Sequence, residues 1–284
     1  MFKKIFFAAA LLLASELIAK PVVIASIAPV EYLAKAVGGD KIEVQSLAKG
    51  DVHSYEPKPN DMKAVAKARI FISAGLEFEE AWIPRFKASA KNLVVVKSDA
   101  KIAKLKEERG EQAEHDEKHE AHADPHVWLN PMLAITMARN ISDALIDMDK
   151  ANKDFYLENF QKLMNDLLAF DESAKESLAG LKNRKFVVYH PAWGYFAEHY
   201  DLEQISIERN GKEPKIDEMA STVKMIKDEN IKVIFADPNR SQKSAQILAS
   251  QTGAKVELLD PLGYNLLENL KIAVGAIKDA NSPK

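Results

Sequence analysis

The chain repeats one hydrophobic pattern. Short apolar runs, often β-branched, alternate with segments whose apolar residues recur at steps of three and four. Short apolar strands separated by helices are typical of a parallel sheet that helices cover on both faces. The pattern predicts a first βα lobe, with strands at 22–27, 42–47, 70–74 and 93–97 and helices at 30–37, 61–68 and 79–90.

The same alternation returns in the last third of the chain, although no internal sequence repeat accompanies it. A helix is expected from Pro131 to about Asp147, before the second lobe begins. That lobe is predicted to contain strands at 186–189, 204–207, 233–236 and 256–259 and helices at 192–199, 217–229, 241–252 and 266–278. Two similar βα lobes are therefore expected, each with a mostly parallel sheet flanked by helices.

One long helix is predicted between the lobes. Apolar residues recur at helical spacing from Tyr156 to Leu181, and neither glycine nor proline interrupts 153–179. Asn152 suits the N-cap, and Gly180 suits the C-terminal end. At ~1.5 Å per residue the helix is about 40 Å long, which predicts a rigid rod joining the lobes. The expected α/β organisation is an N-terminal lobe at 20–150, a linking helix at 151–181 and a C-terminal lobe at 182–284.

Residues 1–19 resemble a secretory signal, with a positive start at Lys3 and Lys4 and cleavage near Ala19. The apolar run at 5–14 is shorter than the ~20 residues that span a bilayer. The sequence contains no cysteine, so neither disulfides nor a lipid-modified cysteine anchor is expected. A net charge of −3 gives no indication of a nucleic-acid surface or a basic membrane patch. Together these features predict an exported protein located in a periplasm.

Four residues far apart in the sequence are candidate metal ligands: His53, His126, His190 and Asp260. Each lies where a predicted strand or loop meets the start of a helix. Ligands of open parallel sheets bind beyond the carboxyl ends of the strands, so these side chains are expected at the cleft between the lobes. Three neutral imidazoles and one carboxylate suit tetrahedral zinc. For any one histidine, the alternative is a buried ring hydrogen-bonded to a backbone carbonyl, so the prediction rests on the set.

The segment 107–124 interrupts the pattern, because it is almost entirely polar and predicts a mobile loop. It contains His115, His119 and His122, which with His126 are spaced four, three and four residues apart. If this segment became helical, its imidazoles would share one face and could bind a second zinc ion weakly. The alternative is a solvated loop whose histidines bind nothing.

Four sequence blocks, in this order, resemble the ZnuA-type periplasmic solute-binding component of ABC zinc importers. The similarity extends to the broader family of zinc- and manganese-binding proteins whose lobes are joined by one long helix, and it covers essentially the whole mature chain. The blocks are His53-Ser-Tyr-Glu-Pro-Lys-Pro59, Asp124-Pro-His-Val-Trp-Leu-Asn-Pro131, His190-Pro-Ala-Trp-Gly-Tyr-Phe196, and Phe235-Ala-Asp-Pro238 leading to Leu259-Asp-Pro-Leu-Gly263.

The resemblance implies that His53, His126, His190 and Asp260 bind the metal. It also implies a monomer that captures zinc and delivers it to a permease in the inner membrane. Manganese-type relatives usually have glutamate at the third position, so His190 favours zinc over manganese. The chain departs from some relatives at Val52, where an acidic residue would add a ligand. It also lacks a disulfide in the second lobe, and its histidine loop is short.

Two alternatives remain open from the residues. A manganese or iron(II) carrier would share the fold and differ at the site. A zinc hydrolase would keep three histidines, an open water position and Asp260 as general base. The absence of a His-Glu-x-x-His motif and the division of the ligands between two lobes both disfavour catalysis.

Several neighbouring residues have structural interpretations. Tyr55, Trp128, Trp193 and Tyr195 are expected to pack around the ligands, and His199 is expected to stabilise a helix end without a metal.

The stiff helix predicts small shifts of lobe or loop on metal release. Ordinary histidine pKa values near ~6.5 predict that metal affinity falls toward pH 5.

Overall fold

The computed structural model describes residues 20–106, 123–208 and 216–281. The expected signal at 1–19 lies outside these residues, and so do His115, His119 and His122. Two parallel four-stranded sheets are present in the described residues, and each has the same kind of strand order, β2-β1-β3-β4 and β6-β5-β7-β8. The predicted α/β class with two βα lobes is confirmed.

The N-terminal lobe contains the first sheet. Its central strand β3 (Ile70–Ser73) is wholly buried, whereas the edge strand β2 (Glu43–Ser46) alternates between exposed and half-buried residues. This difference follows from position, because only a central strand has neighbours on both edges and helices on both faces. The other elements are β1 (Val22–Ala25), β4 (Val94–Lys97), α1 (Ala28–Gly38), α2 (Pro59–Val65) and α3 (Glu77–Ser89).

The C-terminal lobe repeats this arrangement. Its central strand β7 (Val233–Ala236) is wholly buried, and its edge strand β8 (Lys255–Leu258) is largely exposed. The other elements are β5 (Lys185–Val188), β6 (Glu203–Ser206), α6 (Gly194–His199), α7 (Ile216–Asp228), α8 (Lys243–Thr252) and α9 (Leu266–Asn281). In both lobes the strands therefore present their carboxyl ends along one edge of a parallel sheet.

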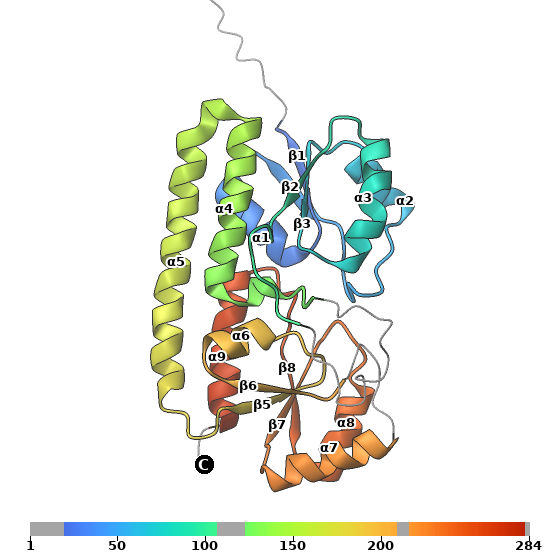
Figure 1. Cartoon of the computed structure of the whole chain (residues 1–284), viewed down its shortest axis with the longest axis vertical. Helices are drawn as coiled ribbons and strands as arrows, with labels where there is room; N and C mark the ends of the chain where they lie inside the picture. Colours follow the sequence, from blue (N-terminus) through green and yellow to red (C-terminus); the bar gives the residue numbers. More distant parts are fainter. Residues whose placement is uncertain (1–19, 107–122, 209–215, 282–284) are drawn as a thin grey trace, which may run out of the picture.

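The long helix α5 (Lys153–Ala179) has the predicted bounds and runs along both lobes, next to α4 (Pro131–Met148) and α9 (Figure 1). Asn152 is the N-cap residue of α5, as predicted, but its side chain makes no capping hydrogen bond. A 3-10 turn, Lys150–Asn152, precedes the helix, and Asn152 Nδ2 donates instead to Asp149 Oδ2 at 2.7 Å. At α4 a side-chain cap is present, because Asn130 Oδ1 accepts from the backbone N–H groups of Met132 and Leu133.

The two lobes share one hydrophobic core. It extends from the first sheet through α1, α4, α5 and α9 to one face of the second sheet, and a smaller cluster lies between the other face and α7 and α8. Buried hydrogen bonds also cross between the lobes: Trp128 Nε1 donates to Pro261 O at 2.7 Å, and Tyr195 Oη donates to Asp124 O at 2.8 Å. The lobes are therefore held by packing as well as by α5. None of the helices that the structure describes is both long and apolar enough to cross a membrane.

Candidate metal site

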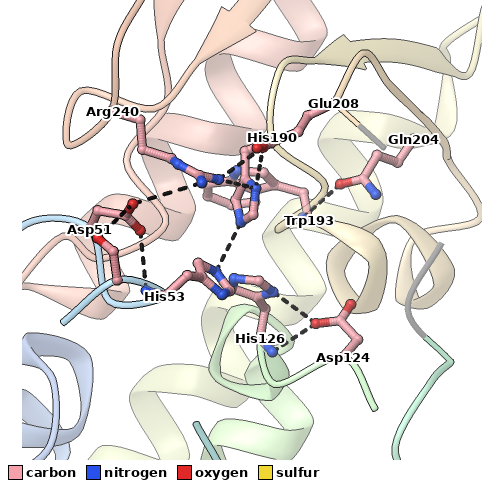
Figure 2. A network of polar contacts seen from close by, with 10 residues as sticks. Asp51, His53, Asp124, His126, His190, Trp193, Gln204, Glu208 and Arg240 are labelled. Carbon is pink, nitrogen blue, oxygen red and sulfur yellow. Dashed lines mark hydrogen bonds and ion pairs between the residues drawn. The ribbon is translucent and has the colours of Figure 1, made fainter. Parts of the chain in front are cut away.

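Three of the four predicted ligands converge between the lobes. His53 lies in the loop after β2, His126 lies at the turn before α4, and His190 follows β5. Each offers a ring nitrogen, and these three atoms all lie within 4.8 Å of one another. Figure 2 shows the three imidazoles facing one another, with ring centroids 4.9 to 5.5 Å apart. Loops that are distant in sequence thus form a cluster of potential nitrogen ligands.

The spacing of His53 and His190 suits a tetrahedral ion. Their Nε2 atoms are 3.2 Å apart. Bonds of ~2.0 to 2.1 Å to a tetrahedral zinc ion place two ring nitrogens about 3.3 Å apart. Without a metal, one of the two nitrogens carries the hydrogen that the other accepts. An ion can therefore replace this hydrogen bond with little movement of the two rings.

His126 is held by a buried carboxylate. Asp124 Oδ1 lies 2.8 Å from His126 Nδ1 and also accepts from the backbone N–H of His126 at 2.8 Å. Both side chains are at least nine-tenths buried. A carboxylate at Nδ1 favours the tautomer with the hydrogen on that nitrogen, which leaves the Nε2 lone pair for a metal. The orientation of His126 therefore suits coordination through Nε2.

His190 has two partners that the sequence analysis did not identify. Its Nδ1 lies 2.7 Å from Glu208 Oε2 and 2.5 Å from Arg240 Nη1. Arg240 Nη1 also lies 2.8 Å from Glu208 Oε2, and its Nη2 lies 3.8 Å from Asp51 Oδ2 in the other lobe. Glu208 could have been identified from the sequence, because it lies just past β6, and ligands of open parallel sheets bind beyond the carboxyl ends of the strands. Arg240 has no sequence signal of its own, because its contacts with His190 and Glu208 join loops that are far apart in the chain, and its contact with Asp51 crosses between the lobes (Figure 2).

Electrostatics keep two of the imidazoles neutral. Partial removal from water, with His126 and Arg240 adding to it, lowers the pKa of His53 to about 4. Burial is also the largest cause of the lowered pKa of His190, and His126, His53 and Arg240 lower it further. Metal binding requires the neutral imidazole, because a protonated nitrogen has no lone pair to donate. Both rings are therefore neutral at neutral pH, as metal binding requires.

Solvent reaches the cluster from the side of His53. This residue is exposed, whereas His126 and His190 are buried. His53 lines a depression together with Gly75, Leu76, Glu77, Glu80 and other residues of the N-terminal lobe. An ion arriving from solvent would meet His53 first.

Asp260 does not belong to this cluster. Among the residues that the structure describes, the group with donor atoms within 4.8 Å contains only the three histidines. Asp260 lies beyond β8, where its Oδ1 accepts from Asn239 Nδ2 at 2.7 Å and from the backbone N–H of Leu262 at 2.9 Å. Its role as a ligand stays a prediction.

Of the aromatic residues expected around the ligands, Trp128 packs against His126, with ring centroids 5.3 Å apart. Trp128, Trp193 and Tyr195 are almost completely buried in the shared core. Tyr55 Oη lies 2.8 Å from Asp61 Oδ2, which helps to fix the loop that carries His53. His199 lies outside the cluster, with its Nε2 2.6 Å from Asp171 Oδ1 on α5. His199 therefore has a carboxylate partner away from the three imidazoles.

Two βα lobes that bring three imidazoles together where they meet define a metal-binding protein of the two-lobed solute-binding class. The family model described as ZnuA, zinc-uptake complex component A, periplasmic, matches residues 23–280. The chain belongs to the ZnuA family. Proteins of this family are the solute-binding receptors of ABC transporters that take up zinc. The predictions that zinc is the bound ion and that the protein is not an enzyme are therefore confirmed.

Individual relatives show the extent of the similarity. The chain is 34% identical over 243 residues to a putative metal-binding protein of Treponema pallidum (strain Nichols), covering 82% of this chain and 77% of that protein. It is 30% identical over 279 residues to the high-affinity zinc uptake system protein ZnuA of Bacillus subtilis (strain 168), covering 91% and 86%. A crystal structure of ZnuA matches it with a TM-score of 0.85 and 35% identity, covering 93% of this chain and 100% of that one.

Proposed function

We propose that this protein captures one zinc ion through the Nε2 atoms of His53, His126 and His190 and delivers it to the permease of its uptake complex. The observation that carries the proposal is the convergence of three ring nitrogens within 4.8 Å, with one pair already 3.2 Å apart. Carboxylates beside His126 and His190 support it, because such partners orient metal-binding imidazoles and increase their basicity.

Asp260 is the proposed fourth ligand. Its Oδ1 is engaged by Asn239 and Leu262, whereas its Oδ2 has no hydrogen-bond partner within the described part of the chain. Coordination by Asp260 requires a shift of the loop after β8 that brings this oxygen to an ion held by the histidines. A fourth protein ligand closes the coordination sphere, as retention of a zinc ion during transport requires.

Zinc fits the proposed donor set better than manganese does. Imidazole nitrogen suits zinc, whereas manganese favours carboxylate, carbonyl and water oxygens. Three imidazoles and at most one carboxylate therefore disfavour a manganese or iron(II) carrier. The Bacillus subtilis relative is named as a zinc uptake protein, which supports the same choice.

Export and assembly complete the proposal. Residues 1–19 act as a signal that is cleaved near Ala19, and the mature chain works in the periplasm as a monomer. Its lobes span 20–150 and 182–284 and are joined by the helix at 151–181.

Release requires only small shifts, because the continuous core and the Trp128–Pro261 hydrogen bond oppose a wide hinge motion. The histidines at 115, 119 and 122 add a weak second zinc site.

Native mass spectrometry of the mature chain tests the main site, after equilibration with equal zinc, manganese and iron(II). The wild type should retain zinc, and His190→Ala should lose it. His199→Ala is the matched control, because it removes a histidine from outside the cluster and should retain zinc. Retention of manganese, or of no metal, by the wild type would refute the proposed ligand set.

The loop histidines need a separate comparison. A variant lacking residues 111–122 should keep the tightly held zinc ion and lose a second ion that appears only at excess zinc. If the wild type never takes up a second ion, the loop contributes no site.

A further inference from the structure

One nitrogen atom of His190 faces two partners of opposite kind. Glu208 Oε2 lies 2.7 Å from Nδ1, and Arg240 Nη1 lies 2.5 Å from the same atom. A carboxylate only accepts a hydrogen bond and a guanidinium only donates one. The Nδ1 atom of a neutral imidazole has either a hydrogen or a lone pair, so His190 can satisfy only one of these partners at a time.

The choice at Nδ1 determines what Nε2 can do. When Nδ1–H donates to Glu208, the hydrogen is absent from Nε2, and its lone pair is available to a metal. When Nδ1 accepts from Arg240, the hydrogen is on Nε2, and no metal can bind there. In that second form Nε2–H points toward His53 Nε2, which is 3.2 Å away and can accept it. Glu208 thus favours the binding tautomer, and Arg240 favours the non-binding one.

The position of Arg240 favours the Nε2–H tautomer when no metal binds Nε2. Its Nη1 lies 2.8 Å from Glu208 Oε2, so its charge offsets the carboxylate that would otherwise attract the Nδ1 hydrogen. Its Nη2 lies 3.8 Å from Asp51 Oδ2, and its side chain is mostly buried. Asp51 Oδ1 also accepts from the backbone N–H of His53 at 3.1 Å. Arg240 therefore connects the surroundings of two proposed ligands from opposite lobes, as Figure 2 shows.

We propose that Arg240 is a positioning residue that holds His190 of the metal-free protein in the Nε2–H tautomer. Zinc capture then requires the hydrogen to move to Nδ1, which donates a hydrogen bond to Glu208. This inference rests on the proposed zinc site. The exchange leaves the ring neutral, because Nε2 gives one proton to solvent and Nδ1 takes one from solvent, while Arg240 keeps all of its own. Arg240 weakens zinc retention and thereby aids release to the permease.

Nitrogen-15 NMR of the imidazoles in the metal-free protein tests the tautomer directly. The expected result is a hydrogen on Nε2 of His190 in the wild type and on Nδ1 in Arg240→Met. Arg139→Met is the matched control, because Arg139 is an exposed arginine on α4 and its loss should leave the tautomer unchanged. A hydrogen on Nδ1 of His190 in the metal-free wild type would overturn the inference, even if the variants failed to fold.

Zinc dissociation, measured by transfer to a chromogenic chelator, provides the second readout. Arg240→Met should release zinc about tenfold more slowly than the wild type, and Glu208→Leu should bind it about tenfold more weakly, the size usual for groups that orient a metal ligand. Arg240→Lys keeps the positive charge. If the charge alone controls release, this variant should release zinc at the same rate as the wild type. Slower release by Arg240→Met with an unchanged tautomer would also overturn the inference.

These two measurements separate the inference from the proposed function. The tautomer is measured without metal, so a wild type that shows Nε2–H but binds no zinc would refute only the zinc site. A wild type that binds zinc but shows Nδ1–H when empty would refute only the role of Arg240.

Discussion

His53 Nε2 and His190 Nε2 lie 3.2 Å apart although the residues belong to different lobes. The separation is close to the about 3.3 Å between two nitrogen ligands of a tetrahedral zinc ion. The relative position of the lobes is therefore already suited to a bound ion.

Replacement of the carboxylate that orients His126 should weaken zinc binding without abolishing it. Asp124→Ala leaves His126 Nδ1 without its partner at 2.8 Å, so the ring is free to rotate and to change tautomer. The expected loss of zinc affinity is about 10- to 100-fold. Competition with a chelator measures it, and one zinc ion per chain should still bind at saturation. Asp143→Ala, an exposed carboxylate on α4, serves as the control.

Acid should destabilise the metal-free protein below the ordinary histidine pKa. The pKa of His53 falls from an ordinary value of 6.5 to about 4 in the folded chain, so the unfolded chain binds more protons between these values. The contribution of His53 to the free energy of unfolding is fully present above pH 6.5 and is lost as the pH falls toward 4. The melting temperature should therefore drop between pH 7 and pH 5, and it should drop less in His53→Gln. An equal drop in both proteins would contradict this assignment.

Zinc affinity should persist to lower pH than ordinary histidines allow. The pKa values of His53 and His190 are both lowered, so protons compete for these two nitrogens only in more acidic solution than the ordinary value implies. Binding isotherms at pH 5, 6 and 7 measure this competition. A sharp loss of affinity centred at pH 6.5 would show that His53 and His190 do not limit binding.

Loss of the buried hydrogen bond between the lobes should destabilise the fold. Trp128→Phe removes the Nε1–H that Pro261 O accepts at 2.7 Å and leaves a buried carbonyl without its partner. The expected decrease in the free energy of unfolding is about 1 to 3 kcal/mol, measured by denaturant titration. Trp82→Phe is the control, because Trp82 is only partly buried at the edge of the core. Equal effects of the two substitutions would argue against this role for the hydrogen bond.

Removal of zinc should lower stability but change the shape of the molecule little. A ligand at 1,000 times its dissociation constant stabilises a fold by about 4 kcal/mol, so chelation should lower the melting temperature markedly. Small-angle scattering should give nearly the same radius of gyration with and without zinc, because one core extends through both lobes. A rotation of the lobes by tens of degrees would contradict the small-shift mechanism.

Elements with a long or repeated hydrophobic pattern could be predicted from the sequence. The bounds of α5 followed from uninterrupted helical spacing, and the strands followed from short apolar runs. Local chemistry at helix ends was harder to predict. Helix α2 begins at Pro59 rather than at Asp61, because proline suits the first helical position. Asn152 is the N-cap residue of α5, but its side chain donates to Asp149 instead of capping the helix.

The sequence by itself determined the two βα lobes, the connecting helix and the placement of three histidines at strand ends or helix starts, since these depend on periodicity and chain order. Only the tertiary structure decided that the three rings meet, that the cluster of donor atoms among the described residues does not include Asp260, and that Glu208 and Arg240 share one nitrogen of His190. These relationships depend on packing between loops that are far apart in the chain. The shared hydrophobic core fixes that packing, and no local pattern encodes it.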